Sequence, residues 1–331
     1  MNPFLEPEGD PSTDGYSRLT NRLLSRMVHR SLDLREHGSS DAEFRLHSSR
    51  FTVTSSSMAD REQSALLHVA RFRFVTAEQL TELLFTGRDD LKESSRQVMS
   101  RQILASLQKK GLIARTPRSV GGPDAGSVRS AYYIRPAGMR AVWELGVGVE
   151  PKRTAPRGTF LLRHSLALVD IALTFDRAAR ETRGHAVIAW EPDWEAALRA
   201  DKLVVVPDAF LSYRTPAGYL DAFIEADLGT MGSRFFEQKI DRYLNLYSTK
   251  SWESRHPKWP TVLTVTTTPS RSLLLRAATE RALKSSFVAD RTREGTEFAF
   301  VDLPSLISHG PLARIWQYAG QGSTKRALFE D

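Results

Sequence analysis

The chain has 331 residues, no cysteine and a formal net charge of +7, with a sequence pI near 9.7. The lack of cysteine excludes disulfides and thiolate metal ligands. No apolar run approaches the roughly 18 residues of a spanning helix, so we expect a soluble, cytoplasmic protein without a membrane partner. The positive charge favours a polyanionic partner, and we expect nucleic acid.

The first 58 residues are expected to form a flexible N-terminal arm. Their start is rich in proline and acids, and one later segment, RLTNRLLSRMVHRSLDL, spaces its apolar residues as a helix would. No second apolar segment lies nearby for that helix to pack against, and a serine- and threonine-rich connector follows. The acidic start differs from a signal or transit peptide, so we expect no export.

Residues 59–148 are expected to form a DNA-binding domain built on three helices. Thr76 with Gln79 three residues later has the form of a capping box, and Gly111 is suited to end the third helix. Apolar residues recur at helical spacing in all three segments, which favours a packed tri-helical unit. The segments are 61–72, 76–85 and 94–111, and the inward residues expected in the third are Val98, Ile103, Leu104 and Leu107.

A β-hairpin is expected after the third helix. Two strand-like runs, 112–116 and 130–135, flank a loop rich in glycine and proline, and Pro136 begins another helix. Three helices and a hairpin are typical of a winged helix-turn-helix, whose third helix enters the major groove of DNA. Two alternatives stay open: the basic residues are solvated surface charges, or the domain binds a protein. The expected contacts to double-stranded DNA are Arg96, Arg101, Lys109, Lys110, Arg115, Arg118 and Arg129.

A second domain is expected over residues 159–318, after a linker at 149–158 and before a C-terminal tail at 319–331. Its segments follow the order αβββαβ, which indicates an α+β or α/β fold. They are a helix at 160–184, strands at 186–192, 203–213 and 219–227, a helix at 230–247 and a strand at 261–268.

Three acids mark the strands of this domain. Glu225 and Asp227 are two residues apart, so they share one face of a strand. A hairpin between the second and third strands would bring Asp208 close to Glu225 if both side chains point to the same side of the sheet. The alternative is that the acids are solvated strand ends and that Pro207-Asp208 is an ordinary turn dipeptide.

The element order and the acids resemble the core of the PD-(D/E)XK nuclease superfamily. That resemblance implies a Mg²⁺ ion bound by carboxylates, which stabilises the phosphate and activates a water for phosphodiester hydrolysis. The sequence departs from the superfamily pattern because Asp227 stands where a lysine is expected, and Lys239 of the following helix would replace it. The implied catalytic residues are Asp208, Glu225, Asp227 and Lys239, and the implied metal ligands are Asp208, Glu225, Asp227 and Glu191.

The chain from Arg61 to Trp316 resembles the replication-relaxation family of plasmid and mobile-element proteins. The resemblance rests on the order of short motifs: the winged helix, RHSLALVDIAL with His164, PDAF, EADLGT, FFEQKIDRYLNLY and LPSLISHGPLARIW. It implies a DNA-binding protein in replication, DNA relaxation or its control. His164 itself is expected to be a hydrogen-bonded, half-buried histidine without a site role, and Asp170 to pair or cap locally.

Two functions remain open at the level of the sequence. The first is a DNA-binding protein whose nuclease-like domain serves binding or assembly, with a second copy or replication and mobilisation proteins as further partners. The alternative is an active Mg²⁺-dependent nickase or nuclease. The missing strand lysine favours the first. The chain has no glycine-rich phosphate loop and no His-x-His spacing, so we expect neither ATP use nor a tyrosine-relaxase mechanism.

Overall fold

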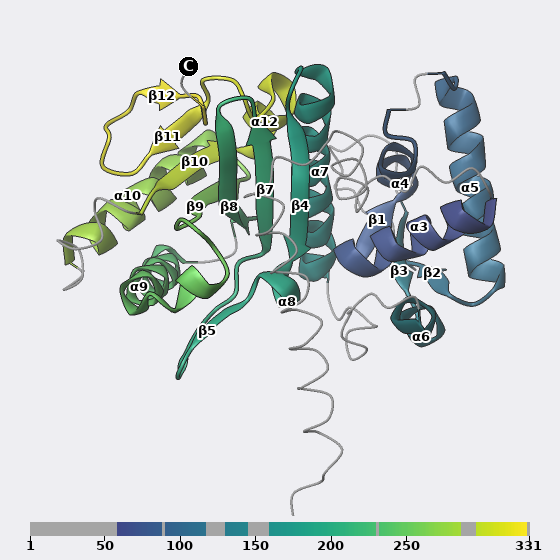
Figure 1. Ribbon diagram of the computed structural model, residues 1–331, viewed down its shortest axis with the longest axis horizontal. Helices are drawn as coiled ribbons and strands as arrows, with labels where there is room; N and C mark the ends of the chain where they lie inside the picture. Colours follow the sequence, from purple (N-terminus) through teal and green to yellow (C-terminus); the bar gives the residue numbers. More distant parts are fainter. Residues whose placement is uncertain are drawn as a thin grey trace, which may run out of the picture. The chain divides into compact units, whose positions relative to one another are not determined.

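A computed structural model describes residues 58–87, 90–116, 130–144, 159–229, 232–285 and 296–329. These residues fold into helices and β-sheets of a mixed α+β protein (Figure 1). The expected arm up to residue 57, the hairpin loop with Arg118 and Arg129, and the expected linker at 149–158 lie outside the described residues. Within the described part, each helix is too short or too polar to cross a bilayer.

The helical part contains the three helices and the hairpin that the sequence predicts. The capping box is confirmed, because Thr76 Oγ1 accepts from the Gln79 N–H at 3.2 Å and Gln79 Oε1 accepts from the Thr76 N–H at 3.1 Å. Gly111 follows the third helix with φ 70°. The helices are α3 (Met58–Phe72), α4 (Ala77–Leu84), α5 (Glu93–Lys109) and α6 (Pro136–Glu144).

A three-stranded antiparallel sheet lies beside these helices. Its strands are β1 (Phe74–Thr76), β2 (Ile113–Arg115) and β3 (Ala131–Ile134), in the order β1-β3-β2. The pairing of β2 with β3 confirms the hairpin. Strand β1 was not expected, because residues 73–75 fell between the first two expected helices without an element of their own. A strand of three residues is too short to show an alternating pattern.

The orientation expected for Val98 is wrong. Val98 is 50% exposed, whereas Ile103, Leu104 and Leu107 are buried as expected. The buried face of α5 begins at Ser100, and Val98 lies two residues earlier, which is about 200° away around a helix. Val98 therefore points away from the core of the helical part.

The sheet part is built on a seven-stranded mixed sheet in the order β12-β11-β10-β9-β8-β7-β4. Strands β8, β9 and β10 run parallel, and the other neighbours are antiparallel. The strands are β4 (Ala186–Pro192), β7 (Ala209–Thr215), β8 (Gly218–Asp227), β9 (Thr261–Thr266), β10 (Phe298–Asp302), β11 (Trp316–Tyr318) and β12 (Lys325–Arg326). Strand β12 lies within the segment expected as a C-terminal tail.

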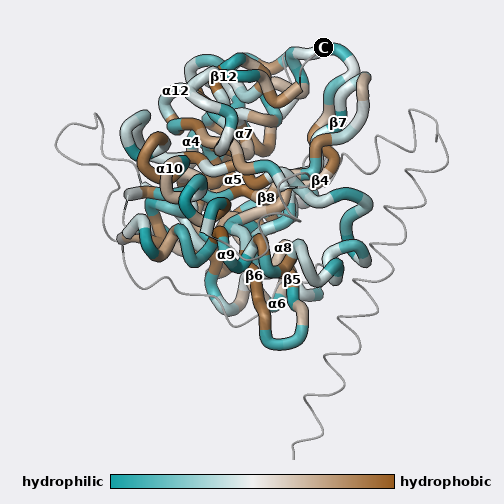
Figure 2. Tube along the Cα trace, turned by 90° about the vertical axis from the view of Figure 1, so that its left-hand side faces the viewer, coloured by the Kyte–Doolittle hydropathy of each residue, from teal (hydrophilic) through white to brown (hydrophobic). Residues whose placement is uncertain are grey.

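Helices cover both faces of this sheet. Alternate residues of β8 enter different cores: Ala222 and Ile224 pack with α7 residues, and Phe223 packs with α9 residues. The hydrophobic stretches of β4 and β8 are visible in Figure 2. The helices are α7 (Thr159–Glu181), α8 (Asp193–Ala196), α9 (Ser233–Thr249), α10 (Pro269–Ser285) and α12 (Leu303–His309), with a 3₁₀ turn at Ser251–Ser254.

The expected strand at 203–213 is two strands. β6 (Leu203–Val205) pairs only with β5 (Leu198–Ala200) in a separate ribbon, and β7 begins at Ala209 in the main sheet. Pro207 has no backbone N–H to donate to a ladder, so the chain changes direction there. In the main sheet, α7, β4, β7, β8, α9 and β9 retain the expected order αβββαβ.

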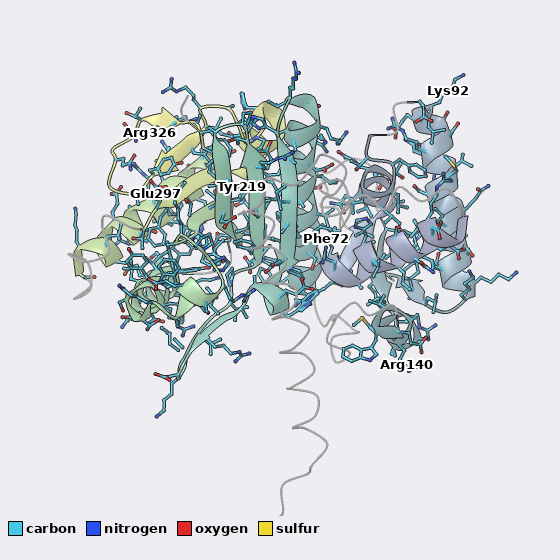
Figure 3. The ribbon with its side chains drawn as sticks, viewed as in Figure 1. Phe72, Lys92, Arg140, Tyr219, Glu297 and Arg326 are labelled. Carbon is cyan, nitrogen blue, oxygen red and sulfur yellow. The ribbon has the colours of Figure 1, made fainter. Side chains whose placement is uncertain are left out.

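Direct contacts join the helical part and the sheet part. Phe72 of α3, which is labelled in Figure 3, packs against Trp190 of β4, with ring centroids 6.2 Å apart. Gln79 of α4 donates to Asp170 Oδ1 of α7 at 2.7 Å. Asp170 was expected to pair or cap locally, but this partner belongs to another helix.

Candidate functional site: a charged pocket at the strand ends

The β7–β8 hairpin brings the three acids to one end of the sheet. Ala209 is paired with Ile224 in the antiparallel register, and the Asp208 N–H donates to the Ile224 carbonyl at 3.0 Å. Asp208 therefore directly precedes β7, beside the end of β8 that carries Glu225 and Asp227. The hairpin that the sequence predicts is the element that gathers these residues.

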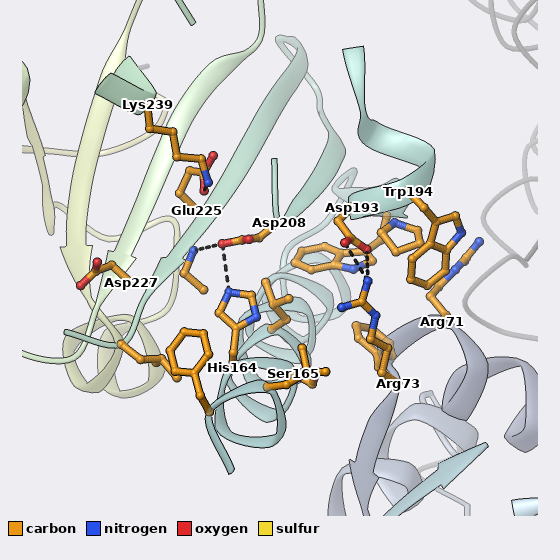
Figure 4. A pocket seen from close by; sticks show the side chains of 18 of the residues that line it. Arg71, Arg73, His164, Ser165, Asp193, Trp194, Asp208, Glu225, Asp227 and Lys239 are labelled. Atoms are coloured by element: carbon orange, nitrogen blue, oxygen red, sulfur yellow. Dashed lines mark hydrogen bonds and ion pairs between the residues drawn. The ribbon is translucent and has the colours of Figure 1, made fainter. Parts of the chain in front are cut away.

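A pocket of about 280 Å³ opens at this end of the sheet (Figure 4). It combines acids, cations and aromatic rings from both parts of the molecule. The charged and polar residues of its wall include Arg71, Arg73, His164, Asp193, Asp208, Glu225, Asp227 and Lys239, and its aromatic residues are Phe72, Phe160, Trp190, Trp194 and Phe236.

Glu225 is the most deeply buried acid of the pocket, with 3% of the residue exposed. Lys239 Nζ forms an ion pair with Oε2, and the Tyr243 hydroxyl donates to Oε1 at 2.5 Å. Lys239 and Tyr243 are four residues apart on α9, so they share the face turned to β8. Burial raises the pKa of Glu225 to about 7, although the charge of Lys239 acts in the opposite direction.

Asp208 is held as a carboxylate by its neighbours. Its Oδ2 accepts the Ala226 N–H at 2.8 Å and lies 3.1 Å from His164 Nε2. Burial acts to raise the pKa of Asp208, but the charge of Lys239 and the bond from His164 outweigh it and lower that pKa to about 2. Conversely, burial acts to lower the pKa of His164, and Asp208 outweighs that effect, so the pKa is raised from 6.5.

His164 lines the pocket, although the sequence led us to expect no site role for it. It is hydrogen-bonded and half-buried as expected, but its partner is Asp208. The available signal was helical spacing: Phe160, His164 and Leu168 recur every four residues on α7, and all three line the pocket. A titratable residue in such an apolar row was a candidate for contact with the acids.

Asp227 lines the pocket but is bound to a cation from another helix. Its two oxygens accept bonds from Arg271 of α10 at 2.7 and 2.9 Å, and Oδ1 also accepts the Gly229 N–H at 2.8 Å. Nothing in the spacing of the sequence linked Arg271 to this strand.

Glu191 does not join the other acids, contrary to its expected role as a metal ligand. The register places it opposite Phe210, which is opposite Phe223, so Glu191 is level with a position two residues before Glu225. β7 also lies between β4 and β8. The Glu191 carboxylate instead accepts a bond from Arg255 at 3.1 Å.

The arrangement of the acids does not fit the Mg²⁺ site that the resemblance implies. Magnesium requires oxygen ligands in near-octahedral geometry. Protein donors engage both oxygens of Glu225, both of Asp227 and one of Asp208. Lys239 and Arg271 already supply positive charge. Among the described residues, no group of three or more histidines and acids is arranged to hold a metal.

Arg73 connects the pocket wall to the helical part. Its guanidinium donates to both oxygens of Asp193, at 2.8 and 2.7 Å, and lies over the ring of Trp194 at 5.4 Å from the centroid. The backbone of Arg73 has φ 66°, an uncommon left-handed conformation for a residue other than glycine. The sequence carried no signal for this contact.

The basic residues expected to contact DNA differ in their surroundings. Arg101, Lys109 and Arg115 are exposed. Arg96 is partly buried and pairs with Glu93 at 2.8 Å, and Lys110 forms an ion pair with Glu62. Arg118 and Arg129 belong to the part of the hairpin that the structure does not describe.

The fold and the pocket define an α+β protein in which a small helical part with a β-hairpin is joined to a sheet carrying internally paired acids. The chain belongs to the replication-relaxation family, whose family model matches residues 66–262, more than half of its length. The match confirms the resemblance and indicates a role in replication or relaxation of mobile elements. It includes Asp208, Glu225 and Lys239 but ends before Arg271. A search of curated proteins and a search of solved structures gave no match.

Proposed function

We propose that this protein binds double-stranded DNA in the replication of plasmids or other mobile elements, in the relaxation of their DNA or in its transcriptional control. In this proposal the helical part is a winged helix-turn-helix: α5 enters the major groove and the β2–β3 hairpin is the wing. The observation that carries it is the exposed surface of α5. Residues 94–109 contain no acid, and Arg101 and Lys109 are exposed there.

The dimensions and charges of this surface suit a duplex. α5 has 17 residues and is therefore about 25 Å long. The major groove admits a single α-helix, and basic side chains beside it contact phosphates. Arg115 of β2 adds an exposed cation from the hairpin that follows α5 in the chain. Arg96 and Lys110 contribute less in this proposal, because each has an acidic partner within the protein.

The salt dependence of binding tests the proposal. Each phosphate contact releases counterions, so the affinity for a random-sequence duplex should fall steeply with salt. The triple variant Arg101→Ala, Lys109→Ala, Arg115→Ala should bind more weakly, with a log–log salt slope smaller by about 2 to 3. Fluorescence anisotropy at several salt concentrations measures both quantities.

A matched control removes the same charge from the sheet part. Arg199→Ala, Lys202→Ala, Lys258→Ala replaces three exposed cations. This control should keep the slope of the unaltered protein. If the two triple variants lose affinity and slope equally, α5 is not the binding surface.

We propose that the sheet part is a PD-(D/E)XK-like core used for binding or assembly, with a second copy or replication and mobilisation proteins as candidate partners. Its acids are neutralised by Lys239, Arg271 and His164. The alternative function for the sheet part is a Mg²⁺-dependent nickase. The observation in its favour is that Asp208, Glu225 and Lys239 line the same pocket.

Incubation of the protein with supercoiled plasmid in Mg²⁺ or Mn²⁺ separates these two candidates. We expect no nicking, and no rise of the melting temperature with either metal, since a ligand that binds the folded state stabilises it. Nicking that disappears in Asp208→Asn, while duplex binding is retained, would establish the nickase instead.

A further inference from the structure

The centre of α5 carries an exposed apolar side chain that the fold does not use. Val98 is 50% exposed and lies on the opposite side of the helix from Ser100, Ile103 and Leu107, which are buried. Its neighbours in the chain are Gln97, which is polar, and Met99, whose Sδ accepts a bond from Arg61 at 3.8 Å. Val98 is therefore accessible to a partner outside this protein's own core.

Other exposed residues of α5 share the face of Val98. Arg101, Gln102 and Ala105 follow at spacings of three, four and seven residues, which places all four on one side of the helix. The set combines a guanidinium, a carboxamide and two small apolar side chains. We refer to these four residues as the α5 outer face. In Figure 1, α5 is the helix at the outer side of the helical part.

We propose that the α5 outer face discriminates base pairs in the major groove. Guanidinium and carboxamide groups make two-point hydrogen bonds to the edges of guanine and adenine respectively, and small apolar side chains contact the methyl group of thymine. Arg101 and Gln102 would therefore select purines, and Val98 with Ala105 would select thymine. This inference rests on the proposed binding of duplex DNA and adds which residues determine its sequence specificity.

A protein partner is the less favoured occupant. Specific protein interfaces bury about 800 Å² per partner around a core that is more apolar than the rim, which is much more surface than one valine and one alanine supply. On the α5 outer face, Arg101 and Gln102 lie between the two apolar residues. Such an alternation suits a row of base edges, in which hydrogen-bonding groups and methyl groups also alternate. An interface in which basic and amide groups alternate with single methyl groups matches the pattern of base edges more closely.

Selection from a library of random-sequence duplexes with the full chain tests the inference. The unaltered protein should enrich one motif that contains thymine. Replacing that thymine by deoxyuridine removes only its methyl group and should weaken binding about fourfold, the equivalent of one buried methyl group. Val98→Ser should bind the two duplexes with the same affinity, because the methyl group has lost its apolar partner. Gln102→Ala should relax the selected base at one other position.

Arg115→Ala is the control, since it removes an exposed charge that lies on β2, outside the α5 outer face. It should weaken binding to all duplexes equally and leave the enriched motif unchanged. Both test residues are exposed, so unchanged melting temperatures will show that the variants fold. Binding without an enriched motif, or a motif that Val98→Ser and Gln102→Ala leave unchanged, would overturn this inference while duplex binding stands. A protein that binds no duplex would instead end the proposed function.

Discussion

Glu225 shows how one buried acid depends on two residues of a neighbouring helix. Its oxygens are bound by Lys239 and Tyr243, and its pKa is raised to about 7 by burial. A raised pKa means that protonation of Glu225 stabilises the folded state. This contribution is fully present below the ordinary pKa of 4.5 and is lost as the pH rises through about 7. Lys239 limits that loss because its charge favours the ionised carboxylate.

Lys239→Met should therefore destabilise the protein in a pH-dependent way. It leaves a buried carboxylate without its cation, which costs about 3 to 5 kcal/mol where that carboxylate is ionised. Urea unfolding should show a large loss near pH 8 and a smaller one near pH 5, where Glu225 takes up a proton. The exposed Lys284 provides a control, Lys284→Met, which should have little effect. Equal losses of Lys239→Met at both pH values would contradict the described pair.

The pKa of His164 depends on its pairing with Asp208 in the same pocket. Asp208 holds the pKa of His164 above 6.5, against the effect of burial. The stability that this pair contributes is therefore present below pH 6.5 and is lost as the pH rises through the raised pKa. Asp208→Asn removes the charge that raises the pKa of His164. That pKa should therefore be lower in the variant than in the unaltered protein, as measured by NMR titration of the ring. Asp227→Asn is the matched control: Asp227 binds Arg271, so the pKa of His164 should hardly move.

At the scale of elements, local signals in the sequence predicted most helices and the strands that form the pocket. The capping box of α4 and the period of α5 are local, and so is the turn between β7 and β8. The split at Pro207 was also visible in principle, since proline interrupts ladders. What could not be predicted depends on distant pairing. β1 exists because it pairs with β3, and Arg271 reaches Asp227 from 44 residues away.

The same distinction applies to side chains. Val98 was assigned to the core because it is apolar, although its phase on α5 excludes it. Glu191 was grouped with the other acids because it ends a strand, although the sheet register separates them. Both assignments relied on the type of residue and not on its position in the helix or sheet. The helical phase of the buried residues of α5 would have corrected the assignment of Val98.

At the scale of the whole molecule, the two parts differ in how their charges are satisfied. The sheet part pairs its buried acids internally with Lys239, Arg271 and His164. Both parts expose cations, but in the helical part Arg101 and Lys109 lie on a helix segment that contains no acid. A protein with net charge +7 therefore has a defined surface at which part of its positive charge is available to a polyanion. Our central claim is that this surface of α5 lies against duplex DNA.

Site-specific crosslinking tests that claim most directly. Because the chain contains no cysteine, Ala105→Cys introduces a single thiol on the α5 outer face, and Lys258→Cys introduces one on the sheet part. Each variant is labelled with a maleimide photocrosslinker and irradiated with a random-sequence duplex. We predict efficient crosslinks to DNA from position 105 and few from position 258. Crosslinks from position 258 alone, with retained duplex binding by both variants, would contradict the claim.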